Sequence, residues 1–174
     1  MANRLVLERP TPKRQREFLG AVERSRALHA TYVAPPRTPE EYRAYLLRQR
    51  GEGQESFFVL APEDRGLAGV ININEIVRHS FQSGSLGYYA FEPYAGRGLM
   101  REGLRIVVGL AFKQLGLHRL EANIQPGNER SIALVASLGF RLEGLSPRFL
   151  KIAGRWRDHL RWAILADEWR SGGH

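Results

Sequence analysis

The chain of 174 residues is 43% hydrophobic, contains no cysteine and carries a formal net charge of +8 from 26 Lys and Arg against 18 Asp and Glu. This length and apolar content predict a single domain, residues 1–174, with a core of its own. The lack of thiols excludes disulfides and zinc–thiolate sites and favours a cytoplasmic setting. The positive charge favours anionic ligands or neighbours. The apolar runs are too short for a membrane span, so no membrane partner is expected.

The first 50 residues predict an edge strand and two helices. The strand is the apolar run at 5–7, and prolines introduce the first helix at 10–28. After a proline-containing loop at 29–37, a Thr-Pro-Glu-Glu capping box begins the second helix at 38–50. Tyr32 in the loop either lines a substrate entrance or belongs to a plain surface connection.

The middle of the chain predicts antiparallel strands with one polar face. Residues 56–60 form a buried strand, and 67–77 form its antiparallel neighbour across a short turn. In the second strand Asn72 and Asn74 alternate with isoleucines, which places both amides on one face. We therefore expect a polar cleft there, in which both asparagines contact a substrate. Residues 80–85 predict a further turn.

The stretch 86–104 predicts an apolar strand, a turn with two glycines and a helix. Gly96 and Gly98 allow the backbone to approach a ligand closely, and the first helical turn presents unpaired N–H groups. This arrangement suits a phosphate or pyrophosphate, although many strand-to-helix turns need glycine for geometry alone. A dinucleotide fingerprint is excluded because its third glycine position is Arg101, and a Walker loop is excluded because no Gly-Lys-Ser/Thr follows.

The last third predicts a strand, a capped helix and a hairpin. Residues 118–124 alternate apolar and polar side chains. Asn128 caps the helix, and the hairpin joins strands at 148–152 and 156–165. In the second hairpin strand Asp158 is in phase with apolar side chains, so its carboxylate needs a partner or a function. A hydrogen bond that fixes the last strand and a contact with a substrate amine are the two interpretations.

This order of elements resembles the GNAT acetyltransferases. The likeness extends from the middle of the chain to its end and is carried by VRHSF at 77–81, GRGLM at 96–100, LGF at 138–140 and GRWRDH at 154–159. It is strongest to the RimJ/RimL branch, which acetylates the N-terminal amines of ribosomal proteins. No diagnostic motif lies in the first 65 residues.

The resemblance implies an α/β (α+β) fold with a mixed, mostly antiparallel sheet. About six or seven strands are expected, splayed between the fourth and fifth, with about four flanking helices. In this family the strand before the glycine turn binds the pantetheine of acetyl-CoA, and the turn holds the pyrophosphate. The family turn begins with Gln or Arg and ends with Gly or Ala, whereas Ala95 and Met100 stand here. These two departures are familiar from the ribosomal-protein branch.

The resemblance also implies contacts with acetyl-CoA and a residue for its thiolate. Backbone N–H groups near Phe91 would hold the thioester and the oxyanion, and Asn128 would contact the pantetheine arm. Many family members place a general-acid tyrosine at the position of Val135, so Ser131, one helical turn earlier, is the candidate that hydrogen-bonds or protonates the thiolate. Alternatively, Ser131 bonds its own backbone. The residues implied for acetyl-CoA are Phe91, Gly96, Arg97, Gly98, Leu99, Met100, Asn128 and Ser131.

Glu121 and Asn123 occupy the polar face of the strand at 118–124 and are the candidates for the base. Asn123 aligns where relatives carry a catalytic glutamate, but an amide accepts no proton at neutral pH, so Glu121, Glu75 or water would act. For either glutamate an orienting role is the alternative. An α-amine has a pKa of roughly 7.7 to 8.0 against about 10.4 for lysine. A weak base is therefore sufficient for an N-terminal substrate.

We expect an enzyme that transfers acetyl from acetyl-CoA to an amine by direct attack. The first interpretation is the N-terminal α-amine of a ribosomal or other protein, with the enzyme a monomer or homodimer. The alternatives are a small-molecule amine acetyltransferase and a non-catalytic module that binds CoA or the ribosome. Neither a metal nor a nucleic-acid module is indicated, because the five histidines are scattered and no aromatic-interleaved basic motif occurs. Expected acceptor contacts are Tyr32, Asn72, Asn74, Tyr88 and Asp158.

Overall fold

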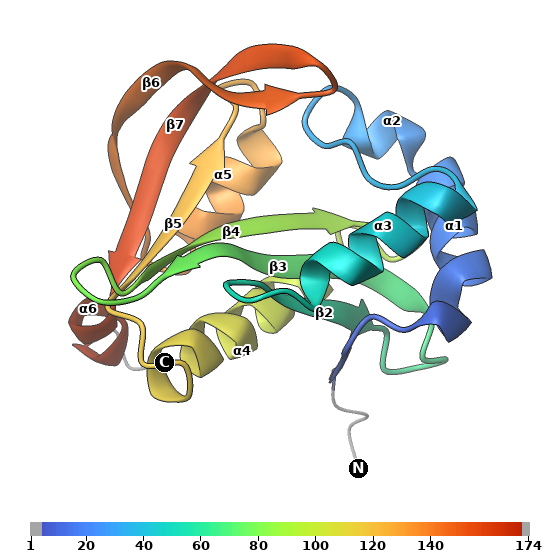
Figure 1. The fold of residues 1–174 in the computed structure, drawn as a ribbon, viewed down its shortest axis with the longest axis horizontal. Helices are drawn as coiled ribbons and strands as arrows, with labels where there is room; N and C mark the ends of the chain where they lie inside the picture. The colour runs from blue at the N-terminus through green and yellow to red at the C-terminus, as the bar shows by residue number, and fades with distance from the viewer. Residues whose placement is uncertain (1–4, 172–174) are drawn as a thin grey trace. The chain divides into compact units, whose positions relative to one another are not determined.

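The computed structural model describes residues 5–171. Seven strands of this part join one sheet in the order β1-β2-β3-β4-β5-β7-β6, and Figure 1 labels β2 to β7 together with the α-helices. The chain divides into two compact units, one of residues up to Asn72 with Tyr88–Leu104 and one of Ile73–Gly87 with residues from Arg105 onward. The single domain at 1–174 stays a prediction.

Helices and strands follow one another along the chain largely in the expected order. Their bounds are β1 (Val6–Glu8), the 3-10 helix η1 (Pro12–Arg14), α1 (Gln15–Arg24), α2 (Arg26–His29), α3 (Pro39–Gln49), β2 (Glu55–Leu60), β3 (Leu67–Val77), β4 (Ser83–Ala90), α4 (Leu99–Lys113), β5 (Arg119–Ile124), α5 (Glu129–Ala136), β6 (Arg141–Ile152), β7 (Arg155–Leu165) and α6 (Ala166–Ser171).

Aromatic side chains form the core of the first unit. Phe18 of α1 lies between Tyr42 of α3 and Phe58 of β2, with ring centroids 4.8 and 5.7 Å away, and all three are fully buried. The helix expected at 10–28 is divided into η1, α1 and α2. The break between α1 and α2 falls at Ser25, whose backbone leaves helical geometry with a φ of −101° and a ψ of 11°. Its hydroxyl accepts a hydrogen bond from the N–H of Glu92 at 2.9 Å.

The predicted N-cap of α3 is confirmed, and Glu41 reaches back as in a capping box but binds one residue before the cap. The Thr38 hydroxyl accepts a hydrogen bond from the N–H of Glu41 at 3.2 Å, and the Glu41 carboxylate accepts one from the N–H of Arg37 at 2.6 Å. Both bonds satisfy backbone donors at the beginning of a helix. Helix α3 therefore begins where the sequence predicts and ends one residue earlier, at Gln49.

The fourth and fifth strands are parallel and pair only briefly. Ser83–Leu86 of β4 pair with residues 119–122 of β5, whereas β5 pairs antiparallel with β7 over its whole length. Strand β4 continues to Ala90, beyond the end of this ladder. The mixed sheet that diverges between its fourth and fifth strands is thus confirmed.

Several boundaries differ from the sequence predictions. Strand β4 begins at Ser83 inside the expected turn, since the small polar residues there pair with β5. Strand β6 begins at Arg141, well before the expected residue 148, because its bulges let it follow β7. Residues 5–171 form six α-helices, more than the expected four, including α6, which was not predicted. Within this range no helix has the length and apolar character needed to cross a bilayer.

Candidate functional site

The glycine turn between β4 and α4 has an open backbone. Gly96 and Gly98 adopt φ angles of +79° and +81°, which side chains rarely allow, and a Cβ built on either would meet no described atom within 4 Å. The glycines are therefore required by the turn's conformation and not by packing. The Leu99 and Met100 N–H groups follow at the start of α4, where helical N–H groups have no intrahelical partner.

The side chains around this turn contact other segments. Arg97 forms an ion pair with Glu63 at 2.6 Å, and the Tyr94 hydroxyl donates a hydrogen bond to Asp64 at 2.7 Å. Both side chains of the Arg97–Glu63 pair are exposed to solvent, so this pair contributes little to stability. Met100 packs against β3, since a Cβ on Gly69 would lie 2.3 Å from its sulfur.

The backbone of β4 after the ladder with β5 offers polar groups on one side. The Phe91 N–H donates to the Ala68 carbonyl of β3 at 2.8 Å, so it is not available for an oxyanion. Because N–H directions alternate along a strand, the Ala90 N–H points away from β3. His29 donates from Nε2 to the Ala90 carbonyl at 2.8 Å, which holds this segment in place.

Asn72 belongs to a hydrogen-bonded group on β2, β3 and α3. Its Oδ1 accepts from the Ser56 hydroxyl at 2.5 Å and from the Tyr45 hydroxyl at 3.2 Å. These two donors fix the orientation of the amide, so its Nδ2 is directed away from them. The sequence did not indicate that Ser56 and Tyr45 bind this asparagine, since the pattern around Tyr45 is that of an ordinary core position of a helix.

Asn128 and Ser131 lie together at the start of α5. The Asn128 side chain accepts a hydrogen bond from the Ser131 N–H at 3.3 Å, which confirms the predicted cap. Ser131 is half-buried and shares a helix face with buried Val135. The cap places the serine hydroxyl at the first helical turn.

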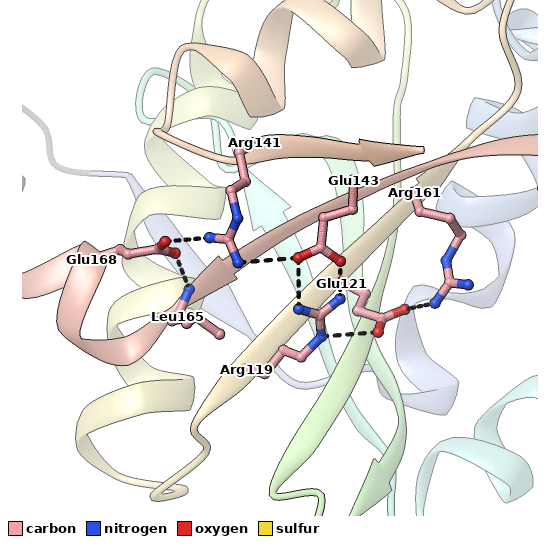
Figure 2. Close-up of polar contacts among 7 residues, drawn as sticks. All are labelled: Arg119, Glu121, Arg141, Glu143, Arg161, Leu165 and Glu168. Atoms are coloured by element: carbon pink, nitrogen blue, oxygen red, sulfur yellow. Dashed lines mark hydrogen bonds and ion pairs between the residues drawn. The ribbon is translucent and has the colours of Figure 1, made fainter. Parts of the chain in front are cut away.

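Glu121 is held between two arginines on β5 and β7. Its carboxylate accepts hydrogen bonds from Arg161 at 2.5 Å and from Arg119 at 3.0 Å, and both contacts are drawn in Figure 2. Burial acts to raise the pKa of Glu121, but the two arginines outweigh it and hold the pKa below its ordinary value. A carboxylate that is ionised and paired in this way is a weak base.

The arginine–glutamate network continues from Glu121 on β5 to Glu168 on α6. Arg119 also binds Glu143 at 2.5 Å, and the Glu143 carboxylate binds Arg141, which pairs with Glu168 of α6 (Figure 2). The Glu168 carboxylate also accepts from the Leu165 N–H at 2.7 Å. The network therefore links β5, β6, β7 and α6.

Asn123 lies two residues further along the same face of β5. Its Nδ2 donates to the Ser85 hydroxyl of β4 at 3.3 Å, whereas its buried Oδ1 has no hydrogen-bond partner among residues 5–171. A buried acceptor without a donor is unfavourable. Asn123 is thus held to β4 through its Nδ2, while its covered Oδ1 stays unsatisfied.

Asp158 does not lie on a buried face, contrary to the sequence pattern. The buried neighbour is His159, which is 3% exposed, whereas Asp158 is exposed and accepts a hydrogen bond from the Arg148 N–H at 2.8 Å. Arg148 has a φ of +47° and lies where the hairpin ladder is irregular. The expected bond that fixes the last strand is therefore present, with the backbone of Arg148 as the donor.

The other acceptor candidates are half-buried. They occur in separate elements: Tyr32 follows α2, Asn74 lies on β3 and Tyr88 on β4. The Asn74 amide lies over Gly87 of β4, since a Cβ there would be 3.1 Å from its Nδ2. Glu75, the alternative base, is exposed and has a φ of +51°.

Comparison with known proteins gives this geometry a family. The protein-family model described as "Acetyltransferase (GNAT) domain" matches residues 4–141 of this chain. The [ribosomal protein uS5]-alanine N-acetyltransferase of Escherichia coli is 37% identical over 116 residues, which is 67% of this chain and 60% of that relative. The chain therefore matches less than two thirds of that relative's length.

Solved structures share the fold. The ribosomal-protein-S5-alanine acetyltransferase of Vibrio fischeri superimposes with a TM-score of 0.82 at 27% identity, over 95% of this chain and 94% of that one. The RimJ of Mycobacterium smegmatis, solved with CoA-disulfide, has a TM-score of 0.84 at 23% identity, over 99% and 90% of the two chains. The chain belongs to the GNAT acetyltransferase family.

Proposed function

We propose that the protein is an acetyl-CoA-dependent N-acetyltransferase whose acceptor is the α-amine of a protein N-terminus. The open glycine turn at Gly96–Gly98 carries this proposal. A turn that presents helix N–H groups without side-chain cover suits a pyrophosphate. The likeness to relatives named for acetylating a ribosomal-protein alanine supports the choice of acceptor.

The co-substrate would be held mainly by the backbone. The N–H groups from Gly96 to Met100 would bind the pyrophosphate, and the polar groups of β4 after Leu86 would bind the pantetheine arm. Asn128 would contact the same arm through its Nδ2, because its Oδ1 caps α5. No step in this arrangement needs a metal ion.

The reaction is a direct acyl transfer. The neutral amine attacks the thioester carbonyl, the new C–N bond forms and the carbonyl oxygen becomes an oxyanion. The nitrogen, now cationic, gives one proton to water, and the C=O bond re-forms as the C–S bond breaks and releases the thiolate. The Ala90 N–H is the oxyanion donor in place of Phe91, whose N–H is used by Ala68. Ser131 would hydrogen-bond the departing thiolate or relay a proton to it.

The amine would be positioned by Asn123 and deprotonated by water. The unpartnered Oδ1 of Asn123 can accept a hydrogen bond from the attacking amine. Glu121 is a poor base, since Arg119 and Arg161 hold it as a paired anion. An α-amine with a pKa of roughly 7.7 to 8.0 needs only a weak base near neutral pH.

Acetyl-CoA turnover on three kinds of acceptor tests this proposal. The acceptors are peptides with a free α-amine, matched peptides whose N-terminus is blocked but which contain lysine, and polyamines. We expect turnover on the free α-amine peptides, measured by release of CoA thiol and by the mass of the product.

The other outcomes contradict the proposal in different ways. Turnover on polyamines alone would establish a small-amine acetyltransferase. Tight CoA binding by calorimetry with no turnover on any acceptor would establish a non-catalytic CoA-binding module.

A further inference from the structure

One face of β7 presents a row of basic side chains, which we call the β7 basic row: Arg155, Arg157, His159 and Arg161. They alternate along the strand and therefore share a face. Both irregularities of the β6–β7 ladder add residues to β6, so β7 keeps its alternation. Coverage differs along the row, since Arg155 is exposed, Arg157 and Arg161 are half-buried and His159 is 3% exposed.

The β7 basic row has more positive charge than the hairpin neutralises. Residues 148–161 contain five Arg and Lys but one acidic residue, Asp158. Asp158 is out of phase with the row, and its carboxylate accepts a hydrogen bond from the Arg148 N–H. Arg161 is paired with Glu121, whereas in the described chain neither Arg155 nor Arg157 has an ion-pair partner.

The guanidinium groups of the row have unused hydrogen-bonding capacity. The Nε atoms of Arg157 and Arg161 are buried without a partner among the described residues. Arg119, by contrast, is bound through Nε by Glu121 and through its terminal nitrogens by Glu143. Buried donors are normally satisfied, so Arg157, which has no ion-pair partner among the described residues, differs from the arginines of the network in Figure 2.

An aromatic side chain packs against two members of the row, and the inner end of the row contacts the candidate catalytic residues on β5. The Arg161 guanidinium lies over the Phe149 ring at 4.3 Å, and the His159 ring is 6.4 Å from the same ring. Arg161 also binds Glu121 on the face of β5 that carries Asn123. A molecule bound along the row would therefore extend from the hairpin end to Arg161, which lies opposite Asn123 in the β5–β7 ladder.

We propose that the β7 basic row binds an acidic peptide segment that follows the acceptor's N-terminal amine. This inference rests on the proposed function and names the substrate class within it. An extended peptide places alternate side chains on one side at the same repeat as the row, so carboxylates at alternate positions match the arginines. A polyamine carries the wrong charge. RNA is less suited, because its phosphates would have to reach Arg157 and Arg161, which are both half-buried.

Matched peptides and matched variants test the acidic-peptide proposal. The peptides share a free N-terminal alanine and differ only at alternate later positions, which carry Glu, Gln or Lys. The variants are Arg157→Gln, in the row, and Lys151→Gln, which removes one charge from the same hairpin. Lys151 lies opposite Trp156, a position out of phase with the row, so it is the control for general attraction.

For the unmodified protein we expect kcat/KM to be about five- to tenfold higher for the Glu peptide than for the Gln peptide. Arg157→Gln should remove most of this preference without changing CoA affinity, and Lys151→Gln should retain it. Arg157→Lys should restore part of the preference. Added salt should reduce it, since exposed charges are screened.

Three results would overturn the acidic-peptide proposal while the proposed enzyme survives. They are equal turnover of the Glu and Gln peptides, equal effects of Arg157→Gln and Lys151→Gln, and inhibition by RNA that depends on Arg157 without any preference for the Glu peptide. Anisotropy of the labelled peptides separates the two proposals. Arg157-dependent binding of the Glu peptide with no turnover would contradict the enzyme and support the binding surface, whereas neither binding nor turnover would overturn both.

Discussion

Ser131 lies at the first turn of α5. Its backbone N–H donates a hydrogen bond to the Oδ1 of the N-cap residue Asn128 at 3.3 Å. A general-acid tyrosine is absent from the later position on this face, because Val135 stands there and is fully buried. The serine hydroxyl is therefore the side chain on α5 that we assign to the departing thiolate. A hydroxyl donates a hydrogen bond to a thiolate more readily than it protonates it.

Ser131→Ala should lower kcat by about ten- to hundredfold while changing CoA affinity little, because the lost hydrogen bond forms mainly as the thiolate develops. Pre-steady-state acetylation and calorimetric titration with CoA measure the two quantities. Ser137→Ala is the matched control, since that exposed serine lies at the opposite end of the same helix and donates to the Leu134 carbonyl at 2.7 Å. Unchanged kcat in Ser131→Ala would remove the serine from the mechanism.

Residue types could be predicted from the sequence more readily than their partners. The carboxylate of Asp158 was expected to need a partner, and the partner is the Arg148 N–H. Glu121 was a candidate base, but the neighbouring strand supplies Arg161 at 2.5 Å. Strand periodicity determines which side chains share a face, whereas partners from another strand depend on register.

At the scale of elements, close contact between β3 and α4 holds the beginning of the helix. Gly69 allows this approach, because a Cβ there would lie 2.3 Å from the Met100 sulfur and 2.8 Å from the Tyr89 carbonyl oxygen. The carbonyl belongs to the backbone and cannot move aside as a flexible side chain can. Gly69 thus helps to place the first turn of α4 and its N–H groups.

Gly69→Ala should lower the free energy of unfolding by about 1 to 3 kcal/mol through overpacking, as measured by urea denaturation. Gly20→Ala in α1 is the control, since its Cβ would lie 3.3 Å from the flexible end of Arg24. That change should be neutral or stabilising by up to about 1 kcal/mol. Equal stabilities of Gly69→Ala and the unmodified protein would show that the contact does not restrict this position.

At the scale of the whole molecule, His29 makes stability depend on pH. It is 4% exposed and packs beside Tyr89 and Phe91. Burial lowers the pKa of His29, and the hydrogen bond to the Ala90 carbonyl only partly opposes this. The unfolded chain therefore takes up a proton near pH 6.5, whereas the folded chain takes it up only at lower pH.

The free energy of unfolding should accordingly be highest above pH 6.5 and fall as the pH drops toward the lowered pKa. The slope from this one group is at most about 1.4 kcal/mol per pH unit. Denaturant titrations between neutral and mildly acidic pH measure it. The decline should be smaller in His29→Gln and unchanged in His118→Gln, an exposed control; the same decline in His29→Gln would exclude His29 as its cause.

The sequence by itself determined the elements that local chemistry specifies. Glycines at Gly96 and Gly98, the Thr38 and Asn128 caps and the alternation of β5 act within a few residues, so they predict a turn, two helix starts and a buried strand face. The GNAT resemblance then indicated a mixed sheet diverging after its fourth strand. These predictions required no knowledge of distant partners.

Only the tertiary structure decided what distant segments supply to one another. The start of β4 at Ser83, the pairing of Glu121 by two arginines and the use of the Phe91 N–H by Ala68 all depend on strand register. The unpartnered Oδ1 of Asn123 is likewise visible only once its surroundings are known. Register, burial and pKa arise from contacts between residues far apart in sequence, and local propensity does not contain them.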